Sequence, residues 1–170
     1  MSIEAEHFAR AVAPPGRQWT VIPDHGRTRS GVAAWPVTAP AAALTAADGM
    51  RLEYAMHLFS QGTATVEVQL APTQKFQPGP GFRYAVSFDD EVPQVVNVHA
   101  DESLGAWEKS VGDGVKRLAT QHAIARPGPH VLKFWAIDPG LVLQKIVVYT
   151  GRSRPSYLGP PESARGATVR

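Results

Sequence analysis

The sequence of 170 residues contains no cysteine, which excludes a disulfide framework, a thiolate metal site and a cysteine nucleophile. The sequence also has little excess charge of either sign, because 17 Lys and Arg are balanced by 15 Asp and Glu, for a net charge of +2. Nucleic-acid-binding domains carry a denser basic surface, so we expect no nucleic-acid partner. A chain of this length forms one domain and buries roughly two-thirds of its unfolded surface.

Long apolar runs are missing as well. The alanine-rich run over 37–47 contains Pro40 and ends at Asp48 and Gly49, so it is not a membrane span, and we expect no membrane partner. The first ten residues are acidic and lack the apolar stretch of a signal peptide. The chain begins on a strand-like segment without a leader, which suggests a domain of a longer protein, and the sequence does not give its compartment.

Catalytic motifs are equally lacking. Asp89, Asp90 and Glu91 are adjacent, but three acids at a hairpin tip indicate a solvated turn more than an acid–base pair. There is no GxSxG elbow and no phosphate-binding loop. The six histidines show no metal-ligand spacing, which favours half-buried, hydrogen-bonded histidines on strands. The residues alone therefore predict no enzyme activity.

What the sequence has in excess is glycine and proline, with 15 of each, or about 18% of the chain against an ordinary share of about 12%. These residues fall between runs with the period-two alternation of strands. The runs predict strands over 52–59, 65–70, 82–88, 94–98, 130–137 and 142–149, with a further strand around 122–124. The pattern predicts an all-β fold, an antiparallel β-sandwich of the jelly-roll type.

One short helix or irregular turn is predicted within 103–119, where Gly112 and Gly114 each weaken a helix by about 1 kcal/mol. Its apolar set is Leu104, Trp107, Val111, Val115 and Leu118. From residue 152 onward the strand pattern stops. We therefore expect a β-sandwich domain over 1–151 and an extended C-terminal tail over 152–170.

Two tryptophans receive different interpretations. Trp135 lies in an alternating run and is expected in the core. Trp107 lies outside any predicted strand, beside acids and His99, and its flat ring could cover the C–H face of a sugar while polar neighbours bind the hydroxyl groups. The alternative is a residue that caps the core, and the sequence leaves both open.

The N-terminal segment suggests a cation site. Glu4 and Glu6 would share one face of a strand, where two like charges repel unless a cation neutralises them. A bound calcium ion would do so with carboxylate and backbone oxygens. On an edge strand, both side chains could instead face solvent.

The opening EAEHF resembles carbohydrate-binding modules of families 6 and 35, which are galactose-binding-like jelly rolls with a structural calcium held by early glutamates. A longer resemblance, over 3–163, is to the C-terminal domain of glycoside hydrolase family 115, the xylan α-1,2-glucuronidases. It rests on IEAEHF, RTRSGVAAWPVTAP, RLEYAMHLF, LAPTQKF, RYAVSFDDEVPQVVNVH, the spaced Trp107, LKFWAIDPGLVLQKIVVYTG and SYLGPPES.

The resemblance implies a parent enzyme, bacterial and periplasmic or secreted, that removes (4-O-methyl)glucuronic acid from glucuronoxylan in a barrel domain absent from this chain. It also implies where calcium would bind. In the module families a late-strand aspartate completes the calcium site. Gln144 stands there in this sequence, and the adjacent Lys145 adds an unwelcome positive charge.

Two functions remain open. As a carbohydrate-binding module for xylan or its glucuronate branches, the domain would use Trp107 as a platform, Asn97, His99 and Asp101 as hydroxyl ligands, and cations for the uronate from among Arg27, Arg29 and Lys109. As a structural domain, it would pack on the parent catalytic domain or form a homodimer, with the tail lying along another domain. A concave aromatic and polar pocket around Trp107 favours binding, and a flat apolar patch favours an interface.

Overall fold

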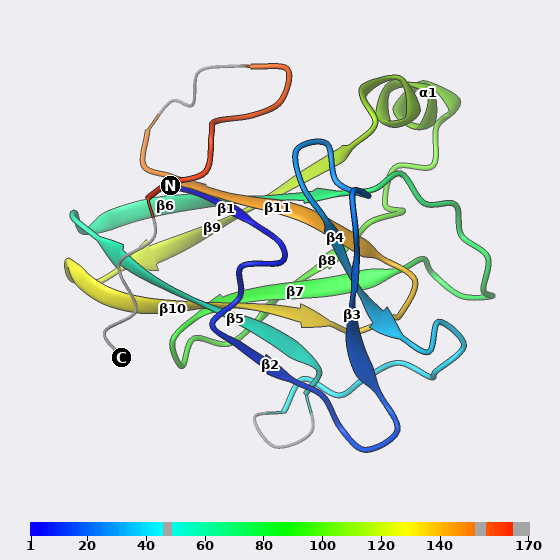
Figure 1. Cartoon of the computed structure of the whole chain (residues 1–170), viewed down its shortest axis with the longest axis horizontal. Coiled ribbons are helices and arrows are strands. Elements are labelled where there is room, and N and C mark those ends of the chain that lie inside the picture. The colour runs from blue at the N-terminus through cyan, green and yellow to red at the C-terminus, as the bar shows by residue number, and fades with distance from the viewer. Residues whose placement is uncertain (46–48, 152–155, 165–170) are drawn as a thin grey trace.

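The computed structural model describes residues 1–45, 49–151 and 156–164, which form eleven strands and one helix (Figure 1). Positions 46–48, with the last two residues of the alanine-rich run, and positions 152–155 and 165–170 of the predicted tail lie outside the described residues. The elements are β1 Ser2–Glu4, β2 Arg10–Val12, β3 Gln18–Ile22, β4 Gly31–Trp35, β5 Arg51–Leu58, β6 Gly62–Leu70, β7 Arg83–Phe88, β8 Gln94–Asn97, α1 Leu104–Asp113, β9 Lys116–Ile124, β10 Gly128–Ala136 and β11 Val142–Tyr149.

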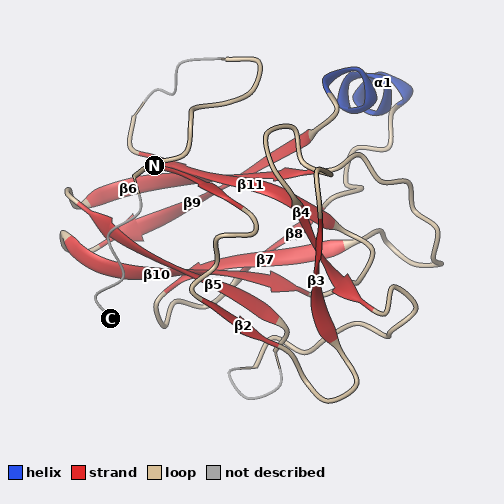
Figure 2. Cartoon of the chain, in the orientation of Figure 1, coloured by secondary structure: helices blue, strands red, loops and turns tan. Residues whose placement is uncertain are grey.

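The strands form two antiparallel sheets that face each other, which confirms the predicted β-sandwich (Figure 2). The six-stranded sheet has the order β3-β4-β11-β6-β9, with β1 also paired to β11, and the five-stranded sheet has the order β2-β5-β10-β7-β8. The predicted hairpin is confirmed by the pairing of β7 with β8. The consecutive strands β5 and β6 lie in opposite sheets, as do β10 and β11, so their short connections carry the chain between the layers.

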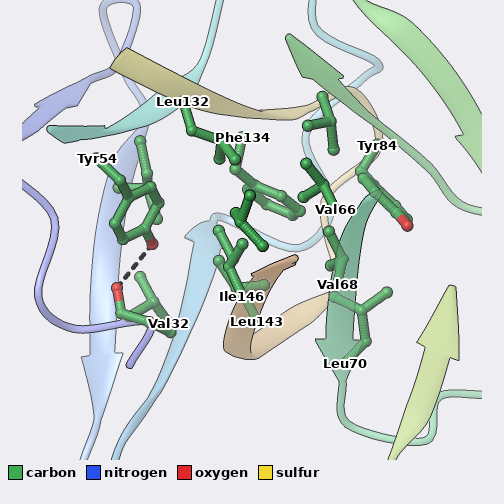
Figure 3. Packing of buried hydrophobic residues seen from close by; sticks show 14 of the residues in the cluster. Val32, Tyr54, Val66, Val68, Leu70, Tyr84, Leu132, Phe134, Leu143 and Ile146 are labelled. Carbon is green, nitrogen blue, oxygen red and sulfur yellow. Dashed lines mark hydrogen bonds between the residues drawn. The ribbon is translucent and has the colours of Figure 1, made fainter. Parts of the chain in front are cut away.

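The core fills the space between the sheets with the inward side chains of each alternating strand. From the five-stranded sheet, Tyr54, Leu132 and Phe134 point toward side chains of the other sheet such as Val66 and Ile146 (Figure 3). The hydroxyl of Tyr54 is buried, and it donates to the carbonyl of Ala5 at 2.8 Å. This burial raises the pKa of the Tyr54 phenol far above its ordinary value.

Trp135 is buried as expected, but it lies outside the main core. The period of two that turns Phe134 inward places Trp135 on the outer face of β10, where it contacts Ala85 and Ile137. Its Nε1 donates to Ser87 Oγ at 3.0 Å. The loop before β5 covers this face so closely that a Cβ on Gly49 would lie 2.4 Å from the indole ring.

The helix α1 is shorter than the predicted range. Ser103 Oγ caps its first turn by accepting from the Ala106 N–H, and Gly114, at φ 65°, ends it. Val115 and Leu118, expected on the helix, therefore belong to the segment that leads into β9 and to β9 itself. Within the described part of the chain, no helix has the length and apolar character needed to cross a membrane.

The described part of the tail contacts its own domain, and its expected contact with another domain stays a prediction. Ser163 N–H donates to the carbonyl of Ser2 at 2.8 Å, and Ser2 Oγ donates to the carbonyl of Pro160 at 3.1 Å. His7 Nδ1 lies 2.6 Å from Glu162 Oε1. Residues 160–163 therefore lie alongside β1 at the edge of the six-stranded sheet.

Candidate functional site

Trp107 lies in a concave pocket of about 200 Å3, which we call the Trp107 pocket. Two parts of the sequence meet there: the loop after β6, and the continuous stretch that runs from the segment after β8 through α1 to the start of β9. Ten residues line it: Thr73, Gln74, Lys75, His99, Asp101, Glu102, Ser103, Trp107, Ser110 and Lys116. Trp107 is the only aromatic ring of the described lining apart from the imidazole of His99, so the surface is aromatic and polar and not a flat apolar patch.

Local capping interactions position Trp107. Asp101 Oδ1 accepts from the Ser103 N–H at 3.0 Å, which fixes the residue that caps α1. The N–H of Trp107 then donates to the Ser103 carbonyl at 3.1 Å, and Ser110 Oγ donates to the Trp107 carbonyl at 2.8 Å. These bonds place Trp107 in the first turn of α1, partly exposed at the pocket.

His99 forms one wall of the pocket, and both of its ring nitrogens are engaged. Nδ1 accepts from the Phe82 N–H at 3.1 Å, and Nε2, which must then carry the proton, lies 2.9 Å from the Thr73 carbonyl. Asn97 does not line the pocket; its side chain bonds the Pro80 carbonyl and the His99 N–H. His99 and Asn97 therefore hold the loops together, and of the two only His99 lines the pocket.

Two lysines and two acids provide the charge of the pocket. Lys75 Nζ lies 3.2 Å from a carboxylate oxygen of Glu102, so these two partly neutralise each other. Hydrogen bonds from Ser103 lower the pKa of Asp101, and the positive charge of Lys116 acts in the same direction. Asp101 is thus ionised at neutral pH. Among the described residues, Lys116 makes no ion pair or hydrogen bond through its ammonium group, so it remains open to an anionic ligand.

The three cations expected at this site lie elsewhere. Lys109 is on α1, 3.1 Å from Asp113, and that contact lowers the pKa of Asp113. The guanidinium of Arg27 stacks on the ring of Tyr157 at 4.2 Å, with both terminal nitrogens buried and without a hydrogen-bond partner. Arg29 lines a separate cavity beside residues 158–162. None of the three belongs to the Trp107 pocket.

Sequence reasoning missed Lys75 and Lys116 as site residues. No motif marks them, because Lys75 lies in a loop and Lys116 begins a strand that follows the helix. The pairing of Leu70 with Lys116 brings the end of β6 beside the start of β9. The pairing register of β6 and β9 therefore brings these residues to the pocket, and the sequence pattern does not show this register.

The predicted calcium ligands have a different arrangement from the one expected. The strand β1 ends at Glu4, and Glu6 lies in the turn that follows, so the two do not share a strand face. The carboxylate of Glu4 is buried, 3.1 Å from Lys145 Nζ, and Thr28 donates to it at 2.7 Å. Gln144 Oε1 is buried without a partner. An ammonium group already neutralises Glu4, so these residues fit a calcium ion poorly, and the described residues contain no cluster of three metal-ligating side chains.

The acidic turn after β7 is not simply solvated. Asp89 Oδ2 lies 2.7 Å from His130 Nδ1, and Glu91 Oε2 lies 2.7 Å from His122 Nδ1. The hydrogen bond with Asp89 raises the pKa of His130. For Asp89, burial opposes the hydrogen bonds from Val131 and His130, and the net effect lowers its pKa. The turn therefore holds two buried histidines, which agrees with the expected hydrogen-bonded role of histidines on strands.

Comparison with known proteins places the chain in a family. The family model described as "Glycosyl hydrolase family 115 C-terminal domain" matches residues 1–162. A solved family 115 4-O-methyl-α-glucuronidase with specificity for decorated arabinogalactans is similar over 89% of this chain, with 16% identity and a TM-score of 0.69. The chain spans 18% of the length of that enzyme. No curated protein matches the chain.

Separate carbohydrate-binding modules share the same fold. The C-terminal family 6 module of a laminarinase from Zobellia galactanivorans matches 88% of this chain and 98% of its own length, with 12% identity and a TM-score of 0.56. A family 35 module from Clostridium thermocellum gives the same coverage, with 14% identity and a TM-score of 0.55. The family match covers nearly the whole sequence, and the chain belongs to the C-terminal domain family of glycoside hydrolase family 115.

Proposed function

We propose that this domain is a non-catalytic carbohydrate-binding module of a family 115 α-glucuronidase and that the Trp107 pocket holds a (4-O-methyl)glucuronic acid branch of glucuronoxylan. The observation that carries the proposal is the pocket itself. A partly exposed tryptophan lies among hydroxyl, carboxylate and ammonium groups contributed by the loop after β6 and by the stretch over 99–116. Sites for small polar ligands combine an apolar surface with a few placed polar groups in this way.

Each part of a uronic acid finds a counterpart in the pocket. The indole of Trp107 would cover the C–H face of the ring. The ammonium of Lys116 would meet the carboxylate, since Lys75 is occupied by Glu102. The ionised Asp101 would accept from sugar hydroxyls but would repel a carboxylate on its own side, and this fixes the orientation of the ligand.

The acidic branch, and not the polysaccharide backbone, is the recognised feature in this proposal. One similar enzyme is described as a 4-O-methyl-α-glucuronidase with specificity for decorated arabinogalactans, so its polysaccharide backbone differs from xylan while the methylglucuronic acid group is the same. Tethered to a catalytic domain, such a site raises the local concentration of branched substrate.

The test is calorimetric titration with aldotetraouronic acid, a xylotriose that carries one methylglucuronic acid. We expect Trp107→Ala to weaken binding at least tenfold, since the stacking surface is lost. Trp35→Ala removes another tryptophan that is 50% exposed and lies outside the pocket, and it should leave binding unchanged. No heat with the wild-type chain, or equal heat with Trp107→Ala, contradicts the proposal.

A structural role is the second candidate, because both α1 and the tail expose apolar side chains. Leu104 and Val111 on α1 and Tyr157 and Leu158 in the tail are all exposed. Arg117 connects the two segments by contacting the Asp113 carboxylate and the Tyr157 carbonyl. Such a surface suits a homodimer or the parent catalytic domain. Light scattering that gives a dimer for the wild type and a monomer for Val111→Asp would favour this role, and a monomer for both would exclude the homodimer.

A further inference from the structure

An exposed aromatic ring lies in the same loop that lines the Trp107 pocket. Phe76 directly follows Lys75, a residue of the pocket lining, in the loop between β6 and β7, and it is 55% exposed. This loop lies at the end of the sandwich that carries α1 (Figure 1). Phe76 itself lies outside the pocket lining, so the binding of a branch at Trp107 does not require it.

Packing on one side fixes the ring of Phe76. Its centroid lies 4.7 Å from that of the buried Phe82, and the two ring planes are tilted by 59°. The other contact is Gly140, which has φ 102° and where a Cβ would lie 2.5 Å from Phe76 Cζ. Glycine at this position lets the ring lie directly on the backbone of the loop after β10. An aromatic side chain that is already held on one side loses little conformational entropy when a ligand covers its exposed side.

The contacts of Phe82 place Phe76 beside the pocket. The ring of Phe82 also packs edge to face against the imidazole of His99, with centroids 5.4 Å apart, and His99 forms one wall of the pocket. A single phenyl ring therefore separates Phe76 from that wall. Gln74, which lines the pocket, is exposed and makes no hydrogen bond with the described residues. Its amide can donate to sugar hydroxyls and accept from them.

The exposed side of Phe76 matches the sugar next to a bound branch. A branch held at Trp107 remains joined to a main chain, whose sugars must leave the pocket over one of its walls. Over the wall formed by His99, the next sugar would meet the ring of Phe76, and the C–H face of a pyranose can cover a phenyl ring as it covers an indole. Lys75, the charged neighbour of Phe76 in the sequence, is paired with Glu102, so the surroundings of the ring suit a neutral sugar.

We propose that Phe76 is a second stacking residue, which binds a neutral main-chain sugar adjacent to the acidic branch in the Trp107 pocket. This inference rests on the proposed function and extends it, because it gives the polysaccharide main chain a contact of its own. Stacking on a ring face tolerates different pyranoses, so Phe76 lengthens the site and leaves the selection of the acidic branch to Lys116 and Asp101. The branch and the main-chain sugar are covalently joined, so the second contact adds affinity without a second association step.

The test compares two ligands by NMR titration. One is the branch alone, as methyl 4-O-methylglucuronide, and the other is aldotetraouronic acid, in which the branch is joined to xylotriose. We expect the wild type to bind the longer ligand more tightly than the branch. Phe76→Ala should weaken binding of the longer ligand about three- to tenfold and leave binding of the branch unchanged. Trp107→Ala should weaken both.

Further variants separate stacking from packing. Phe76→Tyr keeps a flat ring and should bind both ligands as the wild type does. Phe76→Leu keeps an apolar contact with Phe82 but has no flat face, so it should bind the longer ligand as weakly as Phe76→Ala. Phe59→Ala removes another aromatic side chain, 85% exposed and outside the pocket, and should change neither affinity. The amide spectra from the same titrations show that each variant is folded.

The inference is overturned if the wild type binds the longer ligand no more tightly than the branch, or if Phe76→Ala or Phe76→Leu binds the longer ligand as well as the wild type. Equal weakening of both ligands by Phe76→Ala would also overturn it, since the residue would then act only through the pocket. Binding that is lost in Trp107→Ala but unchanged in Phe76→Ala would keep the proposed function and remove this inference. No binding of either ligand by the wild type would remove both.

Discussion

The two ends of the sandwich differ in the chemistry that their loops carry. At the end with α1, the pocket around Trp107 has two lysines beside its acids, one of them without an ionic partner among the described residues. At the other end, two histidines contact acidic side chains: His7 Nδ1 lies 2.6 Å from Glu162 Oε1, and His130 Nδ1 lies 2.7 Å from Asp89 Oδ2. One main hydrophobic core lies between the two ends. The comparison teaches that the two ends differ in their charged groups, whereas the strands between them supply one shared apolar core.

The largest effect should come from a substitution in the hydrophobic core, because such a change destabilises the whole domain. Leu132 is fully buried in the main core, so we expect Leu132→Ala to lower the free energy of unfolding by about 2–5 kcal/mol. For a chain of this size the melting temperature should fall by roughly 5–15 °C. Scanning calorimetry checks this, with Val95→Ala on the exposed edge strand β8 as the control. A fall of less than about 2 °C would mean that the sheets are not packed as described.

A change confined to the end with α1 should affect the Trp107 pocket. Gly81 has φ 120°, and a Cβ there would lie 2.5 Å from Asn97 Oδ1 and 2.7 Å from His99 Cβ. We expect Gly81→Ala to displace His99, to cost about 1–3 kcal/mol and to weaken acidic oligosaccharide binding at least tenfold. Gly79→Ala is the matched control, since Gly79 has φ 131° and open space around its Cβ. Equal binding by the two variants would show that the His99 wall does not shape the pocket.

The charge preference of the Trp107 end should depend on one lysine. We expect Lys116→Met to weaken acidic oligosaccharide binding about three- to tenfold. The wild-type preference should also weaken as salt increases, because salt screens a partly exposed ion pair. Lys109→Met removes a lysine on α1 that lies outside the pocket, and it should have no effect on binding. If both variants behave alike in titrations, net charge and not the pocket determines the preference.

The other end should respond to pH. The pKa of His130 is raised in the folded protein, so its contribution to stability is complete below the unfolded pKa of about 6.5 and is lost as the pH rises through the folded value. The pKa of Asp89 is lowered, so its contribution is present above about 3.8 and is lost as the pH falls through the folded value. Asp89 is half-exposed, so we expect an effect of less than about 1 kcal/mol.

Thermal melts across this range check the sign of the effect. The wild type should lose a small part of its stability between pH 6 and pH 8, and His130→Gln should lose less over the same interval. The exposed histidine variant His57→Gln should follow the wild type. A wild-type melting temperature that rises over this interval, with His130→Gln unchanged, would contradict the assigned pairing.

The smallest effect concerns calcium. Lys145 already neutralises Glu4, so we expect millimolar calcium or a chelator to leave the melting temperature unchanged. A clear rise with calcium that disappears in Glu4→Gln would mean that an ion displaces the Lys145 ammonium, as the resemblance to the module families implies. Magnesium at the same concentration controls for ionic strength.

Much of the fold could be predicted from the sequence, because alternation and turn residues are local signals. The ranges predicted for β7, β8, β10 and β11 lie within one or two residues of the observed strands. The strands β2, β3 and β4 were missed, since β2 is short and the alternation in β3 and β4 is weak. The helix was drawn too long because Val115 and Leu118 continue its spacing by chance, whereas Gly114 in a left-handed conformation ends it.

The candidate site was predicted only in part. Trp107, His99 and Asp101 lie around one pocket as expected, because they are close in sequence. The cations were misplaced, since Lys75 and Lys116 reach the pocket through the register of β6 and β9, which no motif encodes.

A crystal structure of the chain with aldotetraouronic acid would test the central claim most directly. The proposed function predicts a uronic acid ring in van der Waals contact with the indole of Trp107, at about 4 Å, and its carboxylate within about 4 Å of Lys116 Nζ. A ligand found elsewhere, or a Trp107 pocket that stays empty at saturating concentration, would contradict it.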